Sequence, residues 1–127
     1  MHERQLRGAC AESAAARLLE SHGATILLRN YRRRAGEIDL VARLDDVLII
    51  AEVRLRASAA FGGSAASVDR PKQARIIRAA QQLLQQRRDL ARLRVRFDVL
   101  AVSPAPAGVP AGDDAYSIEW IQHAFSS

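Results

Sequence analysis

The sequence predicts an α/β domain in which helices pack on a mixed β-sheet. The first observation is the order of the expected elements, which are a helix at 3–21, strands at 24–31, 37–43 and 47–54, a helix at 70–88, and strands at 95–102 and 116–121. The second is that a helix crosses between strands, which implies that part of the sheet is parallel. The third is the length of 127 residues with 49% apolar composition, which suits one domain with a buried core.

The composition excludes several classes of protein. Cys10 is the only cysteine, so there is no disulfide framework and no thiolate zinc site. The histidines at 2, 22 and 123 lack the spacing of metal ligands. No apolar run is long enough to span a membrane and the N-terminus is not a signal peptide, so we expect a cytoplasmic protein with no membrane segment. The net charge of +5 and the pI near 10.6 favour a polyanionic partner.

The functional interpretation depends on the hairpin formed by the strands at 37–43 and 47–54, which a two-residue turn at 45–46 connects. In such a hairpin, residues whose numbers sum to 91 face each other, which places Asp39 opposite Glu52. Opposed carboxylates repel, and a hard divalent cation such as Mg²⁺ offsets that repulsion. We therefore expect a metal site here. The alternative is that both carboxylates lie half-exposed on a solvated sheet face.

Two further residues are candidates because of their place on the helices. Small residues such as Ala15 and Ala16 let the first helix approach the sheet closely, which would hold Glu12 near it; a solvated Glu at the helix edge is the other interpretation. Asp69 and a proline at 71 predict the start of the second helix. Lys72 lies four residues before Ile76 on the buried stripe of that helix, so we expect it to point toward the sheet.

Arginine supplies almost all of the positive charge. Of the nineteen basic residues eighteen are Arg, and Lys72 is the one Lys. A triplet of arginines precedes the hairpin and others flank Lys72 on the second helix, where they would be exposed. The residues that we expect to contact nucleic-acid phosphates are Arg32, Arg33, Arg34, Arg70, Lys72 and Arg75. An ordinary solvated loop and helix face is the alternative.

The chain resembles a known family at several spaced motifs. Gly-Glu-Ile-Asp-Leu at 36–40 and Glu-Val-Arg at 52–54 are similar to motifs of the YraN family of uncharacterised bacterial proteins, itself similar to the PD-(D/E)XK nucleases and to archaeal-type Holliday-junction resolvases. The other matching residues, within roughly 8–102, are Glu12, Arg29-Asn30-Tyr31, Phe61-Gly62, Lys72 and Arg96-Phe97-Asp98. The resemblance implies a restriction-endonuclease-like fold: one domain spanning 1–127, with an α-β-β-β-α-β core at about 3–102 and a C-terminal loop and strand at 103–127.

The resemblance also implies roles for these residues. Asp39 and Glu52 would bind Mg²⁺ or Mn²⁺, and Glu12 would complete the site directly or through water. The implied activity is metal-dependent hydrolysis of phosphodiester bonds in DNA, with branched DNA as one candidate substrate. The motif lysine, which orients or deprotonates the attacking water, is replaced by Arg54. Lys72 could supply an amine near the site.

Two interpretations of Arg54 remain open. Guanidinium can hold a phosphate but cannot act as a general base, so Arg54 can serve as a phosphate-binding group while the metal alone activates water. Alternatively the chain is a nucleic-acid-binding or scaffold protein that keeps the nuclease fold without catalysis, and Arg54 is a cross-strand partner of Glu37. The sequence does not distinguish DNA from RNA, branched from linear substrates, or a monomer from a homodimer.

Overall fold

The structure, a computed structural model, describes residues 3–56, 68–105 and 116–127. Its elements are α1 (Glu3–Ser21), β1 (Thr25–Arg33), β2 (Gly36–Leu44), β3 (Val47–Leu55), α2 (Arg70–Gln86), the 3-10 helix η2 (Arg88–Leu90), β4 (Arg94–Pro104) and β5 (Tyr116–Phe125). The predicted order of helices and strands is confirmed, and β5 extends four residues beyond its predicted end at 121. The segment 57–67, which includes the motif residues Phe61 and Gly62, lies outside the described residues.

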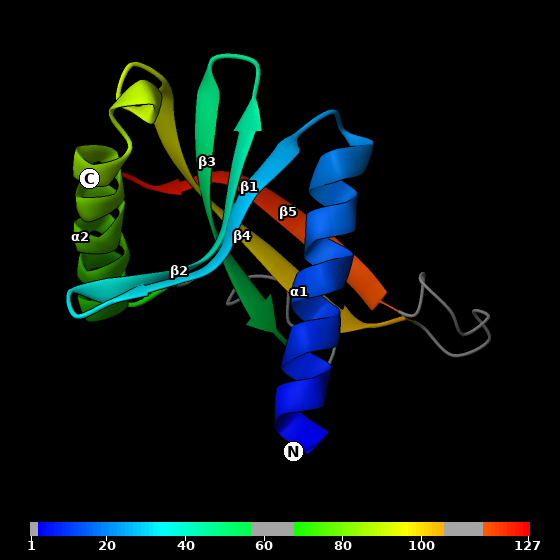
Figure 1. The fold of residues 1–127 in the computed structure, drawn as a ribbon. Coiled ribbons are helices and arrows are strands. Elements are labelled where there is room, and N and C mark those ends of the chain that lie inside the picture. The colour runs from blue at the N-terminus through cyan, green and yellow to red at the C-terminus, as the bar shows by residue number, and fades with distance from the viewer. Residues whose placement is uncertain (1–2, 57–67, 106–115) are drawn as a thin grey trace.

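The five strands form one sheet in the order β1-β2-β3-β4-β5 (Figure 1). Neighbouring strands are antiparallel except for β3 and β4, which are parallel. The crossover between these two strands contains α2, as a parallel connection requires. The predicted mixed sheet with helices is therefore confirmed, and the arrangement is consistent with a restriction-endonuclease-like fold.

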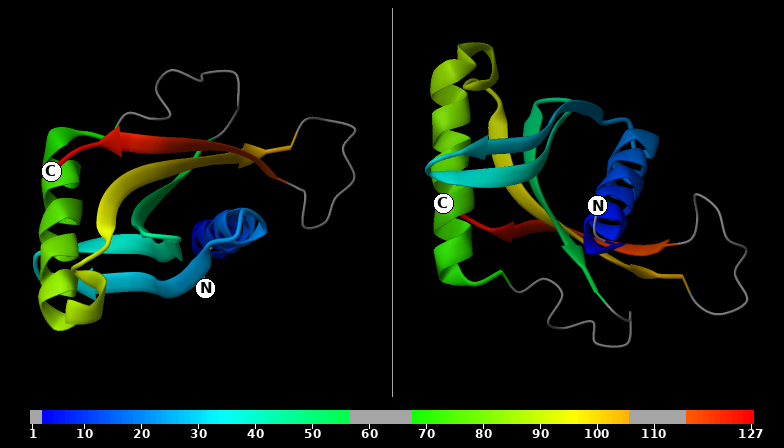
Figure 2. Two further views of the ribbon diagram at one scale, coloured as in Figure 1. Left: turned by 90° about the horizontal axis from the view of Figure 1, so that it is seen from above. Right: turned by 60° about the horizontal axis from the view of Figure 1, so that its bottom comes forward.

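The two helices cover opposite faces of the sheet, which the alternation of β2 and β3 makes clear (Figures 1 and 2). Leu40 and Ile49 are buried with α1, whereas their neighbours Val41 and Ile50 are buried with α2. The α1 side is closed by the small residues Ala11, Ala15 and Ala16 together with Leu19. The α2 side is closed by Ile76, Ala79, Ala80 and Leu83. In the described ranges neither helix is long and apolar enough to cross a membrane.

The closed end of the β1–β2 hairpin bends away from β3 and lies over α2 (Figure 1). Gly36, the first residue of β2, lies directly against the backbone of Arg75, and a Cβ atom at position 36 would overlap the Arg75 carbonyl oxygen. The contact therefore requires glycine for close approach and not for a positive φ angle. This contact holds the hairpin end, with Arg32, Arg33 and Arg34, next to α2 at Arg75, an exposed residue of that helix.

Edge strand β5 is attached to β4 around one fully buried carboxylate, that of Asp98. Its oxygens accept hydrogen bonds from Arg96 Nε and Nη2 at 2.9 and 2.8 Å, from Trp120 Nε1 at 2.9 Å and from the backbone N–H of His123 at 3.0 Å. The β4–β5 register shifts at this position, where His123 has φ 54°. Asp98 therefore supplies the acceptors that the irregular end of β5 would otherwise lack.

Candidate functional site

The candidate site lies where β2 and β3 separate. Backbone pairing runs from Leu44 opposite Val47 to Leu40 opposite Ala51, so the predicted register, in which paired numbers sum to 91, is confirmed. The next pair would be Asp39 and Glu52, and here the ladder ends. Asp39 Oδ2 instead accepts a hydrogen bond from the backbone N–H of Val53 at 2.8 Å. A carboxylate thus replaces the backbone acceptor at the point of separation.

Asp39 and Glu52 form a buried pair of carboxyl groups. Glu52 is only 6% exposed, and Asp39 is half-buried. Burial first, and then the nearby charge of Glu52, raise the pKa of Asp39 to about 7, although the hydrogen bond from Val53 opposes that shift. Near neutral pH the pair therefore holds negative charge at a cost. A cation between the two groups would relieve that cost.

Lys72 contacts the same pair from α2. Its Nζ lies 2.6 Å from Glu52 Oε1. The first turn of α2 fixes this position, because the Asp69 side chain accepts a hydrogen bond from the backbone N–H of Lys72 at 2.8 Å and Pro71 lies in that turn, directly before Lys72. The Lys72 side chain remains 41% exposed. The prediction that Lys72 points toward the sheet is confirmed, and its amine links a buried carboxylate to solvent.

Glu12 approaches the pair from α1, on the other side. It is half-buried between two fully buried small residues, Ala11 and Ala15, of the stripe that packs on the sheet. Burial and the charge of Asp39 raise the pKa of Glu12, while the side chain of Asn30 and the nearby guanidinium of Arg29 favour its charged form. Glu12 is therefore partly buried and lies within the electrostatic reach of Asp39.

The carboxylates of the site are the groups that could bind a metal ion. Within 3–56, 68–105 and 116–127, no three side chains among His, Cys, Asp and Glu are gathered so that they could hold a metal ion together. Mg²⁺ does not require three, since it keeps several waters and usually binds one or two carboxylates together with substrate phosphates. The pair of Asp39 and Glu52 fits that requirement, with Glu12 beside it.

Glu37 and Arg54 were expected to be cross-strand partners in the β2–β3 hairpin. The backbone pairing of these strands ends at Leu40 and Ala51 and includes neither residue. Glu37 is opposite Arg32 of β1 and forms an exposed ion pair with it, with 3.3 Å between Nε and Oε2. The prediction failed because the N-terminal part of β2, before Leu40, is no longer paired with β3, while its pairing with β1 continues to Gly36. Arg54 is half-buried on β3, two residues after Glu52.

The arginines predicted to bind phosphate are brought together by the contact between Gly36 and Arg75. Arg33 lies over the Tyr31 ring, with its guanidinium carbon 4.2 Å from the ring centroid. The predicted arginines, which are all exposed, are Arg32, Arg33, Arg34, Arg70 and Arg75. They form a basic surface over the hairpin end and α2, on the helix that also carries Lys72.

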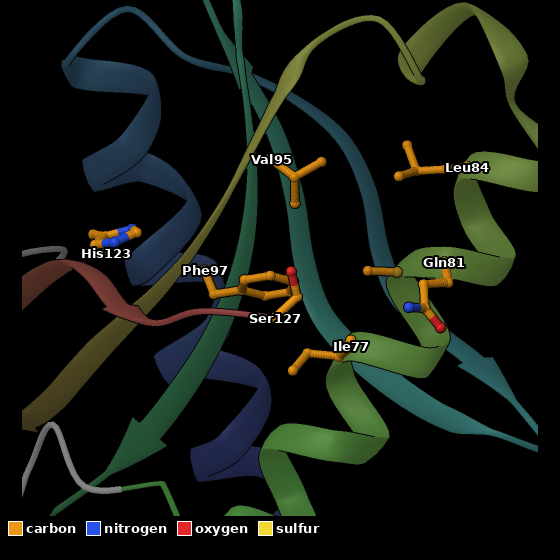
Figure 3. A pocket seen from close by; sticks show the side chains of 8 residues that line it. Ile77, Gln81, Leu84, Val95, Phe97, His123 and Ser127 are labelled. Carbon is orange, nitrogen blue, oxygen red and sulfur yellow. The ribbon is translucent and has the colours of Figure 1, made fainter.

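A separate pocket lies between α2 and the β4–β5 side of the sheet (Figure 3). Its walls are mostly apolar and include Ile77, Leu84, Val95 and Phe97, with His123 at one side. Among the described residues that line it there is no Asp or Glu side chain. This pocket is therefore distinct from the acidic pair.

Comparison with known proteins identifies the family of the chain. Residues 11–102 match the family described as "Uncharacterised protein family UPF0102". The chain belongs to UPF0102. It is 45% identical over 119 residues to a UPF0102 protein of Saccharophagus degradans, an alignment that covers 94% of this chain and 92% of the relative. A UPF0102 protein of Cupriavidus pinatubonensis is 45% identical over 123 residues, with 95% and 86% covered, and one of Stutzerimonas stutzeri is 39% identical over all 127 residues, with 100% of both chains covered.

UPF0102 membership confirms the resemblance to the YraN family. The matched range contains every residue of the candidate site, from Glu12 to Lys72. The names of the relatives state no activity, so the chemistry of this UPF0102 protein has to be argued from its own residues.

Sequence reasoning missed two groups in this UPF0102 site. One is the backbone N–H of Val53, which carries no signal in the sequence. The other is Asn30, which the motif resemblance included but for which no role was predicted. Asn30 has φ 54° in the middle of β1, and an Asn within an otherwise β-forming segment is the signal that could have identified it.

Proposed function

We propose that this UPF0102 protein is a metal-dependent nuclease that hydrolyses phosphodiester bonds in nucleic acid. The observation that carries the proposal is the pair of Asp39 and Glu52, in which burial first and then the charge of Glu52 raise the pKa of Asp39 to about 7. Such a pair lowers the stability of the fold, so its presence indicates a function that requires two carboxylates. Two adjacent carboxylates beside a basic surface are suited to a hard cation and a phosphate.

The residues have separate roles in this proposal. Asp39 and Glu52 would hold Mg²⁺ or Mn²⁺, and the hydrogen bond from Val53 fixes one Asp39 oxygen and leaves the other available as a ligand. Such a cation would supply Lewis-acid chemistry and an activated water. Glu12 acts through water, because the described part of the chain has no three-carboxylate cluster that would include it as a direct ligand.

In this proposal Arg54 and Lys72 together take the roles that the motif lysine has in the similar nucleases. Arg54 stays charged at any working pH, so it holds the scissile phosphate and stabilises the charge that develops there. Lys72 has its amine 2.6 Å from Glu52, beside the pair, and in this proposal it is the amine that takes the place of the motif lysine next to the attacking water. This division is supported by the position of Lys72 and by the chemistry of the two side chains.

The proposed substrate is DNA, with branched DNA as the first candidate, and the proposed location is the cytoplasm. The support is the basic surface formed by the hairpin end and α2, which adjoins the acidic pair through Lys72. Phosphate contacts by arginine release counterions, so binding would weaken steeply as salt is raised. An affinity that stays constant between low and physiological salt would argue against a nucleic-acid substrate.

The test is cleavage of labelled linear, flap and four-way DNA with Mn²⁺ or Mg²⁺, together with calorimetric titration of the metal. Wild type should bind metal and cleave at least one substrate, and EDTA should stop cleavage. Asp39→Ala and Glu52→Gln should abolish both. Absence of metal binding at millimolar concentration in wild type would overturn the proposal.

A nucleic-acid-binding protein without catalysis is the second candidate, and Arg54 is the observation that favours it. In that case the Lys72–Glu52 ion pair and the hydrogen bond to Asp39 are structural. DNA binding would then persist in EDTA, and no substrate would be cut with Mn²⁺.

A further inference from the structure

Asn30 adopts a backbone conformation that its strand does not need. Its φ of 54° lies in the left-handed region, which costs a residue with a side chain more than it costs glycine. The β1–β2 register is regular on both sides, with Arg29 opposite Leu40 and Tyr31 opposite Ile38. That register places Asn30 across from Asp39, at the opening of the acidic site.

The left-handed residue changes where the side chains of β1 point. In a regular strand, consecutive side chains lie on opposite faces of the sheet. Here Arg29 Nη2 donates to Ser13 Oγ of α1 at 3.1 Å, and the side chain of the next residue, Asn30, which is exposed, favours the charged form of the adjacent α1 residue, Glu12, and so opposes the rise of its pKa. Two successive side chains of β1 therefore act on the same helix. Tyr31 then returns to the core on the α2 side.

Asn30 thus lies between two of the acidic groups, with Glu12 on α1 and Asp39 on β2. An amide can donate a hydrogen bond to a carboxylate without adding charge to an already acidic site. Residues that orient groups around a metal often matter nearly as much as the ligands themselves. Backbone strain that is maintained next to such a site is typical of a functional constraint.

We propose that Asn30 is a positioning residue whose side-chain amide holds the Glu12 carboxylate toward Asp39 and Glu52, so that Glu12 can accept hydrogen bonds from cation-bound water. This inference rests on the proposed metal binding at Asp39 and Glu52. It assigns to Asn30 an effect on metal affinity that is separate from its effect on the fold.

The test compares Asn30→Gly with wild type by Mn²⁺ titration and by thermal melting in EDTA. Glycine accepts the left-handed conformation freely, so the variant should be at least as stable without metal. Its Mn²⁺ affinity should nevertheless fall about tenfold, as is typical when a partner of a metal-site group is lost. Ser13→Ala is the matched control, because it removes the neighbouring contact between α1 and β1 and should change Mn²⁺ affinity less than about twofold.

A double-mutant cycle keeps the inference testable even if the glycine variant melts early. Asn30→Gly should cost no further affinity in the Glu12→Gln background, since the two residues act as one unit. Equal Mn²⁺ affinity of wild type and Asn30→Gly would overturn the inference and leave the proposed function intact. Loss of metal binding in wild type itself would overturn the proposed function, and the inference with it.

Discussion

The carboxylate of Asp39 accepts a hydrogen bond from the backbone N–H of Val53 at 2.8 Å, where the ladder between β2 and β3 has ended. This contact secures the strand opening and at the same time holds a carboxylate near Glu52. The geometry therefore stabilises the fold through one oxygen of Asp39 and costs stability through its charge. The charge cost disappears when Asp39 is neutral, so a neutral side chain that keeps an acceptor for Val53 separates the two effects.

Asp39→Asn should remove the cost of the charge and keep an acceptor for Val53. The pKa of Asp39 is about 7 in the folded protein against a usual 3.8, so the folded state binds the proton more tightly. The contribution of Asp39 to stability should thus be greatest below about pH 4 and be lost as pH rises through 7, a change of at most about 4 kcal/mol at 1.36 kcal/mol per pKa unit.

The Asp39→Asn variant should lack this loss of stability with rising pH, and at pH 8 it should be as stable as wild type or more stable. Chemical denaturation at pH 4, 6 and 8 measures the difference. Asp39→Ala is the control that also removes the acceptor, and it should be less stable than Asp39→Asn at every pH. A wild type with no loss of stability from pH 4 to 8 would show that Asp39 does not carry the charge cost.

Divalent cations should raise the melting temperature of wild type, because a ligand that binds only the folded state stabilises it. At a concentration of one hundred times Kd, the expected gain is about 2.7 kcal/mol. Glu52→Gln should abolish the gain. Glu37→Gln is the matched control, since Glu37 is exposed and paired with Arg32 on the other strand, and it should keep the gain in full. Thermal melts with Mg²⁺, Mn²⁺ and EDTA measure these values, and an equal gain in Glu52→Gln would place the cation elsewhere.

Much of this arrangement could be predicted from the sequence, because local signals specify it. The alternation of apolar residues and the turn at 45–46 gave the β2–β3 register, and Asp69 with Pro71 gave the start of α2. The position of Asp39 beside Glu52 followed from that register alone. These features depend on short-range chemistry that one sequence contains.

What could not be predicted depends on the divergence of strands. Glu37 pairs with Arg32 because the part of β2 before Leu40 is paired with β1 and not with β3. No residue pattern in the sequence marks the point where the pairing with β3 begins. The network around Asp98 was also missed, although an Asp in the middle of an apolar strand indicates a buried carboxylate that must find donors.

Gly36→Ala should detach the hairpin end from α2. A methyl group at this position would overlap the Arg75 carbonyl, so the hairpin has to shift, at a cost typical of overpacking of about 1–3 kcal/mol. The basic surface would be split by the same shift, which should weaken DNA binding. Arg34→Ala is the control, since it removes one exposed charge without moving the hairpin. Fluorescence anisotropy at two salt concentrations and thermal melts test this, and an Ala variant with unchanged stability would contradict it.

Asp98→Asn should release β5 from the sheet. The change leaves Arg96, whose side chain is 22% exposed, without its carboxylate, and breaking a buried pair costs about 3–5 kcal/mol. Asp89→Asn is a matched control, because Asp89 makes the same two-bond contact with Arg87 on the surface, and it should cost little. Hydrogen exchange of β5 amides and chemical denaturation measure the effect. Equal losses in the two variants would show that the Asp98 network does not hold the strand.

The last prediction concerns the pair of cations at the acidic site, Arg54 and Lys72. If Lys72 handles the proton, Lys72→Met should lower the single-turnover cleavage rate about 10²–10⁴-fold, the usual contribution of a positioned acid or base. Lys72→Arg should not rescue it, because guanidinium does not release a proton. Metal affinity should change little in either variant, since the ligands remain Asp39 and Glu52.

Arg54→Lys then separates the two roles. In the Lys72→Met background a lysine at position 54 should restore part of the cleavage rate, because an amine again lies on the strand that carries Glu52. In the wild-type background the same change should lower DNA affinity or leave it unchanged, since Lys binds phosphate as a point charge and Arg binds it bidentately. Rapid-quench assays with Mn²⁺ and a labelled four-way junction measure the rates. A Lys72→Met variant as fast as wild type would show that the amine at 72 only balances the charge of Glu52, and that cation-bound water reacts without a protein base.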